Sequence, residues 1–390
     1  MSAIEGQISI KLYPKKMLHE RVEITSSRPV HAAKILIGKT PEQALALIPL
    51  LFNICGVAQS RVALSAIQQA LQLEQPAALE TARDMLVLSE NAKEHLLRVF
   101  LDWPTLFGLQ NKNHQLPYLS QLVATFKTAL FEQSDAFSLN STLNSDFANA
   151  EQAINELETY LHEHVFCCPT EQWLAINSSA DLRQWAATTD SIAAVALNNI
   201  DQQGWSAQGP SSCPPLPLLD ASSLLEQMNA SDAAAFIAQP TWQGHCYETT
   251  ALSRQMQQPL IHLLQQEFDN GLITRWTARL VEIALIPQQM LQLLNTLKNK
   301  QHDAPNNTAQ LGLAQVEAAR GRLIHRVSIK DGRISNYQIL APTEWNFHPQ
   351  GLIAQSLLHI DTQDKQELDQ LTRLMINAID PCVGYQLSIH

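Results

Sequence analysis

The sequence lacks the features of nucleic-acid-binding, membrane-spanning and secreted proteins. It has 26 Lys and Arg against 37 Asp and Glu, for a net charge of -11 at pH 7, and no block of basic residues that would attract a phosphate backbone or an anionic membrane. Apolar runs such as ALALIPLLFNICGVA are too short and interrupted to span a bilayer, and the N-terminal MSAIEGQISIKL has no basic segment followed by an apolar one. We therefore expect a cytoplasmic protein with no nucleic-acid partner and no membrane span.

Cysteine is also scarce. Six cysteines in 390 residues are too few for a disulfide framework, so reduced thiols are expected. Cys55 and Cys382 differ from the others in their neighbours, which read NICGVAQS at 53–60 and DPCVGYQLSIH at 380–390. Cys55-Gly56 resembles half of a metal-binding CGxC pair, but Ala58 occupies the position of the second thiol.

The pattern of apolar residues predicts a mainly α-helical α+β protein, read as a single domain over 1–390. GQISIKLY followed by RVEI predicts a β-hairpin within 1–30, and RVSIKDGRISNYQIL predicts a second hairpin around Asp331-Gly332 within 311–345. Most of 40–300 has helical periodicity, beginning at the capping-box sequence TPEQ. Loops are expected at 208–217 and 298–310, and helices with the Cys382 motif at 346–390.

The last helical pattern, QELDQLTRLMINAI, must end before Asp380-Pro381, because the residue before a proline disfavours the helical conformation. Cys382 is therefore expected just past a helix end. Cys55 is expected at the start of the helix that follows Gly56, where the helix N-terminus could stabilise its thiolate.

Five stretches, in the same order, resemble the large (catalytic) subunit of nickel-iron hydrogenases. AIEGQISIKL is similar to its RIEGHLRIEV, NICGVAQS to RICGVCxxxH, and CYETTALSR to xxEVGPLAR. EAARGRLIHRVSIKDGRISNYQILAPTEWNFHP resembles EAPRGxxxHxxxxxDGxIxNYQxxxPSTWNxxP, and DPCVGYQLSIH resembles DPCxxCxxH. The resemblance implies a mainly helical core with small β elements near both termini.

Departures from that pattern fall on the metal ligands. A nickel-iron site needs four thiolates, and this chain matches only the first cysteine of each pair, at Cys55 and Cys382. The resemblance implies that the lost bridging positions are Ala58 and Tyr385. Val62, Asn53 and Ser388 likewise replace the family's His, Arg and terminal His. The resemblance therefore argues against hydrogen turnover and against bound nickel.

Other parts of the family's site remain. The resemblance implies that Arg320 and Thr343, with Pro342 preceding, donate hydrogen bonds to cyanide ligands on iron. A salt bridge is the alternative role for Arg320. Glu5 matches a proton-relaying glutamate, and a simple surface carboxylate is an equal alternative there.

The combination is similar to the HupK/HoxV-type hydrogenase expression/formation proteins, which resemble large subunits without the bridging cysteines. This implies a non-catalytic scaffold in hydrogenase maturation. It would hold an iron carrying cyanide and carbonyl ligands between Cys55 and Cys382, and pass it to the hydrogenase large subunit, with maturation chaperones as further partners.

Two other hypotheses stay open at this point. One is a catalytic large subunit whose metal site takes Tyr385, Ser388, His390 or the terminal carboxylate as extra ligands. The other is a metal-free mimic of the large subunit that occupies its place on a partner.

Overall fold

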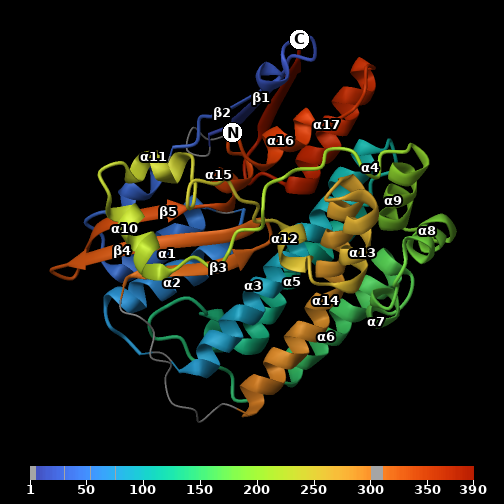
Figure 1. Cartoon of the computed structure of the whole chain (residues 1–390). Helices are drawn as coiled ribbons and strands as arrows, with labels where there is room; N and C mark the ends of the chain where they lie inside the picture. The colour runs from blue at the N-terminus through green and yellow to red at the C-terminus, as the bar shows by residue number, and fades with distance from the viewer. Residues whose placement is uncertain (1–5, 30, 53, 75, 300–310) are drawn as a thin grey trace.

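Two small β-sheets and a large helical body make up the protein (Figure 1). The structure, a computed structural model, describes residues 6–29, 31–52, 54–74, 76–299 and 311–390. The strands are β1 (Ile8–Leu12), β2 (Val22–Ser26), β3 (Leu313–Ala318), β4 (Gly321–Lys330), β5 (Arg333–Leu340) and β6 (Tyr385–Ile389).

The helices lie mainly between β2 and β3. They are α1 (Pro41–Leu51), α2 (Gly56–Ala70), α3 (Ala77–Leu97), α4 (Trp103–Leu106), α5 (Leu116–Leu130), α6 (Ala148–Leu161), α7 (Thr170–Leu174), α8 (Ser179–Thr188), α9 (Ile192–Gln202), α10 (Ala221–Asn229), α11 (Ala233–Ala238), α12 (Ala251–Gln255), α13 (Pro259–Phe268), α14 (Leu272–Asn299), α15 (Pro342–Asn346), α16 (Leu352–Leu358) and α17 (Lys365–Ile379).

The first sheet joins the two ends of the chain in the order β2-β1-β6. β1 and β2 form the predicted antiparallel hairpin, with Ile10 opposite Ile24. β6 lies parallel to β1, with Ile8 opposite Tyr385. The hairpin is confirmed, whereas the prediction of helices and a cysteine motif at the C-terminal end missed this last strand.

The second sheet has the antiparallel order β3-β4-β5. Asp331 and Gly332 connect β4 to β5, and both have positive φ, as a type I′ hairpin turn requires. The predicted hairpin is therefore confirmed, and β3 extends it. Because side chains alternate along a strand, Leu323 packs in a cluster with α1 and α2, whereas Ile324 packs in a cluster with α10 and α11.

Several helix boundaries follow the sequence signals. The Thr40 side chain caps α1 in a capping box with Gln43, and Pro41 is its first residue. α17 ends at Ile379, immediately before Asp380-Pro381, as predicted. Residues 208–217 contain no helix, as expected. α14 continues to Asn299, so the loop expected from 298 begins later, and the rest of it lies outside the described residues.

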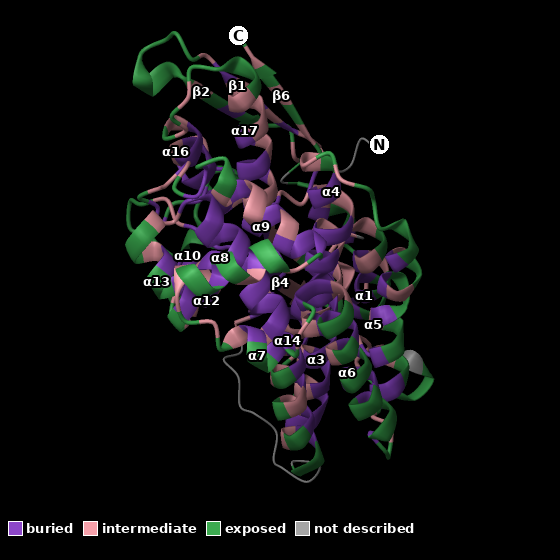
Figure 2. Cartoon of the chain, turned by 90° about the vertical axis from the view of Figure 1, so that its right-hand side faces the viewer, coloured by how far each residue is buried: buried purple, intermediate pink, exposed green. Residues whose placement is uncertain are grey.

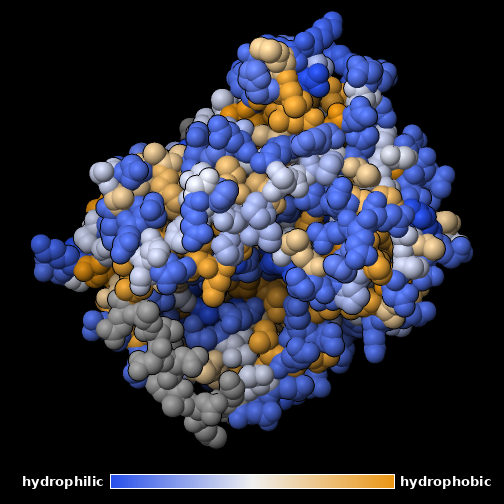
Figure 3. Space-filling view, viewed as in Figure 1, coloured by the Kyte–Doolittle hydropathy of each residue, from blue (hydrophilic) through white to orange (hydrophobic). Residues whose placement is uncertain are grey.

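The long helices α3, α5, α6 and α14 pack against one another in the body, where the buried residues concentrate (Figure 2). No helix in the described ranges combines the length and the apolar character needed to cross a membrane. The face in Figure 3 is mostly hydrophilic, with an apolar area at the top over the terminal strands. The candidate site lies where the start of α2 and the C-terminal part of α3 meet the turn between β3 and β4 and the segment that precedes β6.

Candidate functional site

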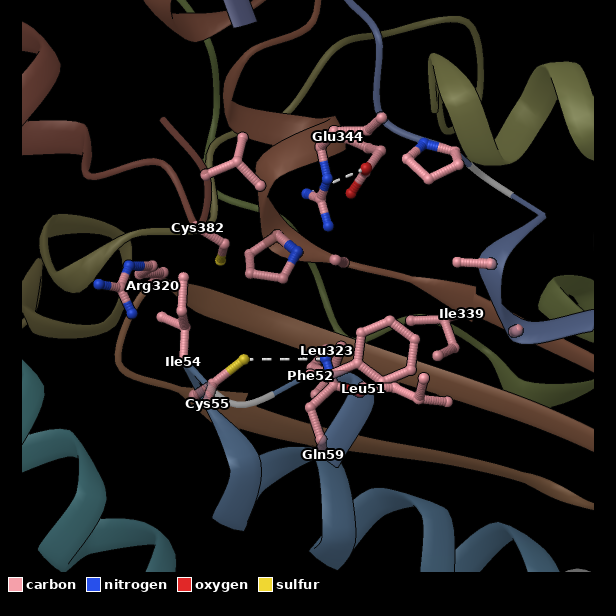
Figure 4. A pocket seen from close by; sticks show the side chains of 18 of the residues that line it. Leu51, Phe52, Ile54, Cys55, Gln59, Arg320, Leu323, Ile339, Glu344 and Cys382 are labelled. Carbon is pink, nitrogen blue, oxygen red and sulfur yellow. Dashed lines mark hydrogen bonds and ion pairs between the residues drawn. The ribbon is translucent and has the colours of Figure 1, made fainter. Parts of the chain in front are cut away.

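Segments far apart in the sequence meet around one pocket (Figure 4). Cys55 comes from the α1–α2 junction, Arg320 from the turn between β3 and β4, Pro342 from the start of α15, and Cys382 from the segment between α17 and β6. The empty volume is about 950 Å³, including space open to solvent. Cys55, Cys382, Arg320 and Pro342, four of the residues that the sequence singled out, line this pocket.

Cys55 precedes the first residue of α2, as predicted, but the N-terminal N–H groups of that helix do not stabilise the Cys55 sulfur. The backbone N–H groups of Val57 and Ala58 donate to the Glu90 carboxylate of α3, at 2.9 and 2.8 Å. The pKa of Cys55 is raised well above 9.0, first by its hydrogen bond to Cys382, then by burial and by the negative charges of Cys382 and Glu90. The expectation that the helix would stabilise this thiolate was wrong, because a carboxylate already occupies the free N–H groups.

A series of hydrogen bonds connects Cys55 through Gln59 and His325 to Tyr337. Gln59 Nε2 donates to Cys55 Sγ at 3.7 Å, and Gln59 Oε1 lies 2.8 Å from His325 Nε2. His325 Nδ1 lies 2.9 Å from the Tyr337 hydroxyl. Burial lowers the pKa of His325 to about 3, so its imidazole is neutral. Because the Gln59 oxygen can only accept, His325 carries its proton on Nε2 and accepts from Tyr337.

Cys382 lies in a more electropositive environment. Its backbone N–H donates to Thr343 Oγ1 at 3.1 Å. The pKa of Cys382 is lowered to about 6, first by the hydrogen bond from Cys55, then by the positive charges of Arg320 and Arg28 and by the Thr343 hydroxyl, while burial opposes the shift. The pair therefore consists of a thiolate at Cys382 and a thiol at Cys55 near neutral pH.

Arg320 lines the pocket and also forms ion pairs. Its Nε lies 3.2 Å from Asp380 Oδ1, and its Nη1 lies 3.1 Å from Glu94 Oε2. All three side chains are at most 5% exposed. Arg320 therefore does form the salt bridges that were considered as its alternative role. These ion pairs hold its guanidinium beside the cysteines.

Pro342 and Thr343 take different places. Pro342 is in the pocket wall, whereas Thr343 is not among the lining residues and reaches the site through Cys382. Glu5 and Asn53 lie outside the described residues, so the proton-relay interpretation of Glu5 stays a prediction.

The positions of the missing bridging cysteines do not face the pocket. Ala58 is fully buried in the cluster around α2, and Tyr385 accepts a hydrogen bond from Arg373 of α17. Ser388 lies 3.4 Å from His390, whose ring stacks on Tyr13 at the edge of the terminal sheet. Neither these side chains nor Tyr385 line the pocket, so the ligands that a catalytic alternative would need do not meet there.

Among the residues that the structure describes, no group of three or more His, Cys, Asp or Glu side chains could hold a metal ion. Within the described ranges, the pocket therefore holds two sulfurs without a third residue of these types placed to complete a metal site. Sequence reasoning missed Arg28, Gln59 and Glu90, all of which bear on the site. Gln59 had a signal in its position four residues after Cys55, but Glu90 had none, since it lies within an ordinary helical pattern.

Comparison with known proteins shows which protein family and which relatives this chain resembles. A family model described as nickel-dependent hydrogenase matches residues 182–387. The chain is 30% identical over 385 residues to the hydrogenase expression/formation protein HoxV of Cupriavidus necator, which covers 93% of this chain and 91% of that protein. It is 27% identical to the hydrogenase expression/formation protein HupK of Azotobacter vinelandii, with 98% of each chain covered.

Solved structures give the same result for the fold. An NAD+-reducing [NiFe]-hydrogenase superposes with a TM-score of 0.60 at 14% identity, covering 93% of this chain and 92% of that one. A Ni-Fe-Se hydrogenase from D. vulgaris Hildenborough gives 0.54 at 18% identity, with the same coverage. The predicted fold class, mainly helical α+β of the hydrogenase large-subunit type, is confirmed.

Proposed function

The chain belongs to the nickel-dependent hydrogenase family, and from this premise we propose that it is a non-catalytic maturation protein. In this proposal it holds an iron that carries cyanide and carbonyl ligands between Cys55 and Cys382, and passes that iron to a hydrogenase large subunit. The names of its relatives HoxV and HupK, hydrogenase expression/formation proteins, support the maturation role.

The single observation that carries the proposal is the pair of sulfurs facing one pocket with no third ligand beside them among the described residues. Thiolates are soft ligands that suit iron, and tightly bound diatomic ligands can fill its other positions. Two bonds to protein leave the iron open to exchange with a partner that offers more thiolates. The same arrangement lacks the bridging sulfurs that a nickel-iron centre needs.

Charge in the pocket supports an anionic cargo. Two thiolates and cyanide ligands outweigh the charge of ferrous iron, so the bound group is negative as a whole. Arg320 and Arg28 both line the pocket, and both act on the Cys382 thiolate. Arg320 is held by Asp380 and Glu94, which presents a fixed planar donor group to the cargo.

Infrared spectroscopy of protein purified anaerobically from cells that produce a hydrogenase tests this function. We expect cyanide and carbonyl stretches together with bound iron and no nickel. A protein with both Cys55→Ser and Cys382→Ser, prepared in parallel, should lack the stretches and the iron.

Other outcomes would contradict the proposal. Bound nickel with hydrogen turnover would identify a catalytic large subunit instead. Absence of iron, combined with normal hydrogenase maturation in cells that carry the double serine variant, would identify a structural mimic.

A further inference from the structure

Arg28 lies at the opposite side of the pocket from Arg320. It follows β2 and lines the same pocket as the two cysteines. In Figure 4, Arg320 is to the left of the two sulfurs, while Glu344, the ion-pair partner of Arg28, is to the right. The thiol pair thus has a guanidinium on each side, although only Arg320 was recognised from the sequence.

The contacts of Arg28 leave part of its binding capacity unused. Its Nη1 lies 3.1 Å from Glu344 Oε1, and the two side chains are 19% and 10% exposed. Within the described ranges, Arg28 Nη1 makes this ion pair but no hydrogen bond of good geometry, and Glu344 Oε2 is a buried oxygen without a hydrogen-bond partner. A buried donor without a well-placed acceptor costs free energy, so Arg28 is better satisfied when a ligand that accepts hydrogen bonds reaches it.

Arg28 also interacts electrostatically with the cysteines. Burial acts to lower its pKa, but the negative charges of Glu344, Cys382 and Cys55 more than compensate, and its pKa is raised. A fully charged guanidinium therefore faces the position where thiolates and cyanide ligands would gather. Arg offers several N–H donors in a fixed plane, which suits the terminal nitrogen of a cyanide.

Glu344 makes this pair a departure from the family pattern. The sequence PTEWN at 342–346 aligns with the family's PSTWN, so a carboxylate stands in place of a hydroxyl residue. A carboxylate buried at the pocket wall is costly unless a cation accompanies it. Arg28 is that cation, so the two residues form one unit at the pocket.

We propose that Arg28 is a second binding residue for the anionic iron cargo, opposite Arg320, and that Glu344 positions its guanidinium until the cargo enters. This inference rests on the proposed function. It adds that the Arg28 side of the pocket binds the negative charge of the cargo. When cargo binds, it accepts hydrogen bonds from Arg28 in place of Glu344, and Glu344 remains close enough to pair with Arg28 again after release.

The test compares three variants with the parent, all purified anaerobically from hydrogenase-producing cells, by iron content and cyanide stretching frequency. Arg28→Gln should lower iron retention by roughly tenfold, the loss expected for a charge-assisted hydrogen bond, and shift the cyanide stretch. Arg28→Lys, which keeps the charge, should recover most of the retention. Glu344→Gln, which removes the competing carboxylate, should retain iron at least as well as the parent but still shift the stretch.

A purely structural ion pair would behave differently, because removing either partner would then reduce retention together with stability and leave the stretch of the remaining cargo unchanged. Arg21→Gln is the matched control, since it removes a positive charge from the same hairpin, where Arg21 Nε donates to the Lys16 carbonyl in an exposed hydrogen bond. It should match the parent.

The failures are distinguishable. A parent without cyanide or carbonyl stretches overturns the proposed function, and this inference with it. A loaded parent together with a folded Arg28→Gln protein of unchanged iron content and unchanged stretch overturns only this inference. If Arg28→Gln does not fold, Glu344→Gln decides: loss of cargo in that variant contradicts the proposal.

Discussion

Cys55 and Cys382 hold matching places in two similar motifs, yet their surroundings differ in charge. Cys382 is close to Arg320, Arg28 and the Thr343 hydroxyl, which favour its thiolate. Cys55 has the Glu90 carboxylate nearby and donates its proton toward Cys382. In the proposed function, iron would meet one ready thiolate and displace a proton from the other thiol, so metal binding and proton release would be coupled.

The largest expected effect comes from removing either sulfur. Cys55→Ser and Cys382→Ser should each abolish iron retention, because neither oxygen replaces a soft thiolate ligand. Both residues lie at element ends, so the fold should remain, as judged by circular dichroism. Cys168→Ser, at a cysteine outside the pocket, is the matched control. If Cys55→Ser retained iron, the Cys382 thiolate alone would be the ligand and the pair would not act together.

A second, smaller effect concerns thiol reactivity in metal-free protein. The thiolate is the nucleophile, so near pH 7 Cys382, with its pKa of about 6, should react with iodoacetamide at least about tenfold faster than Cys55. Lowering the pH through 6 protonates Cys382 and should slow its reaction, whereas Cys55 should react only as the pH rises above its raised pKa. Peptide mass spectrometry after short pulses measures both rates. Equal alkylation rates would show that the two cysteines do not differ in thiolate character.

The smallest effect is expected at Thr343. Thr343→Val keeps the shape but removes the hydroxyl that accepts from the Cys382 N–H, which should cost about 1 kcal/mol of stability. The Thr343→Val substitution should also raise the pKa of Cys382, so the pKa difference between Cys382 and Cys55 should become smaller. Thr343→Ser, which keeps the hydroxyl, should behave like the parent. The pH dependence of Cys382 alkylation and a urea titration measure the two effects, and an unshifted alkylation profile in Thr343→Val would exclude the hydroxyl from setting this pKa.

Local signals in the sequence predicted the local parts of the fold. The hairpins around Asp331-Gly332 and at the N-terminus, the capping box at Thr40 and the end of α17 each depend on a few adjacent residues, so they could be read directly. Strand β6 was missed because its partner is β1, and pairing between the two ends of a chain leaves no local pattern.

The same distinction applies to the site. Motifs placed Cys55, Cys382, Arg320 and Pro342 around one pocket, since family resemblance carries spatial information that spacing alone lacks. The error about the α2 N-terminus arose from Glu90, which lies on a different helix and reaches the N–H groups only after packing. Arg28 was missed for a similar reason, because no neighbouring residue in the sequence marks it as part of the pocket.

The parallel pairing of β6 with β1 has a consequence for synthesis of the protein. Cys382 lies just before a strand whose partner is made much earlier in translation, so residue 385 must find residue 8. A contact of such long sequence separation requires the closure of a large loop, which costs conformational entropy. Until residue 382 has been made, the chain therefore has Cys55 but no complete pocket, and the proposed cargo would have no second sulfur to bind. The sheet that contains β1 and β6 would thus make loading with the proposed cargo depend on the synthesis and pairing of β6.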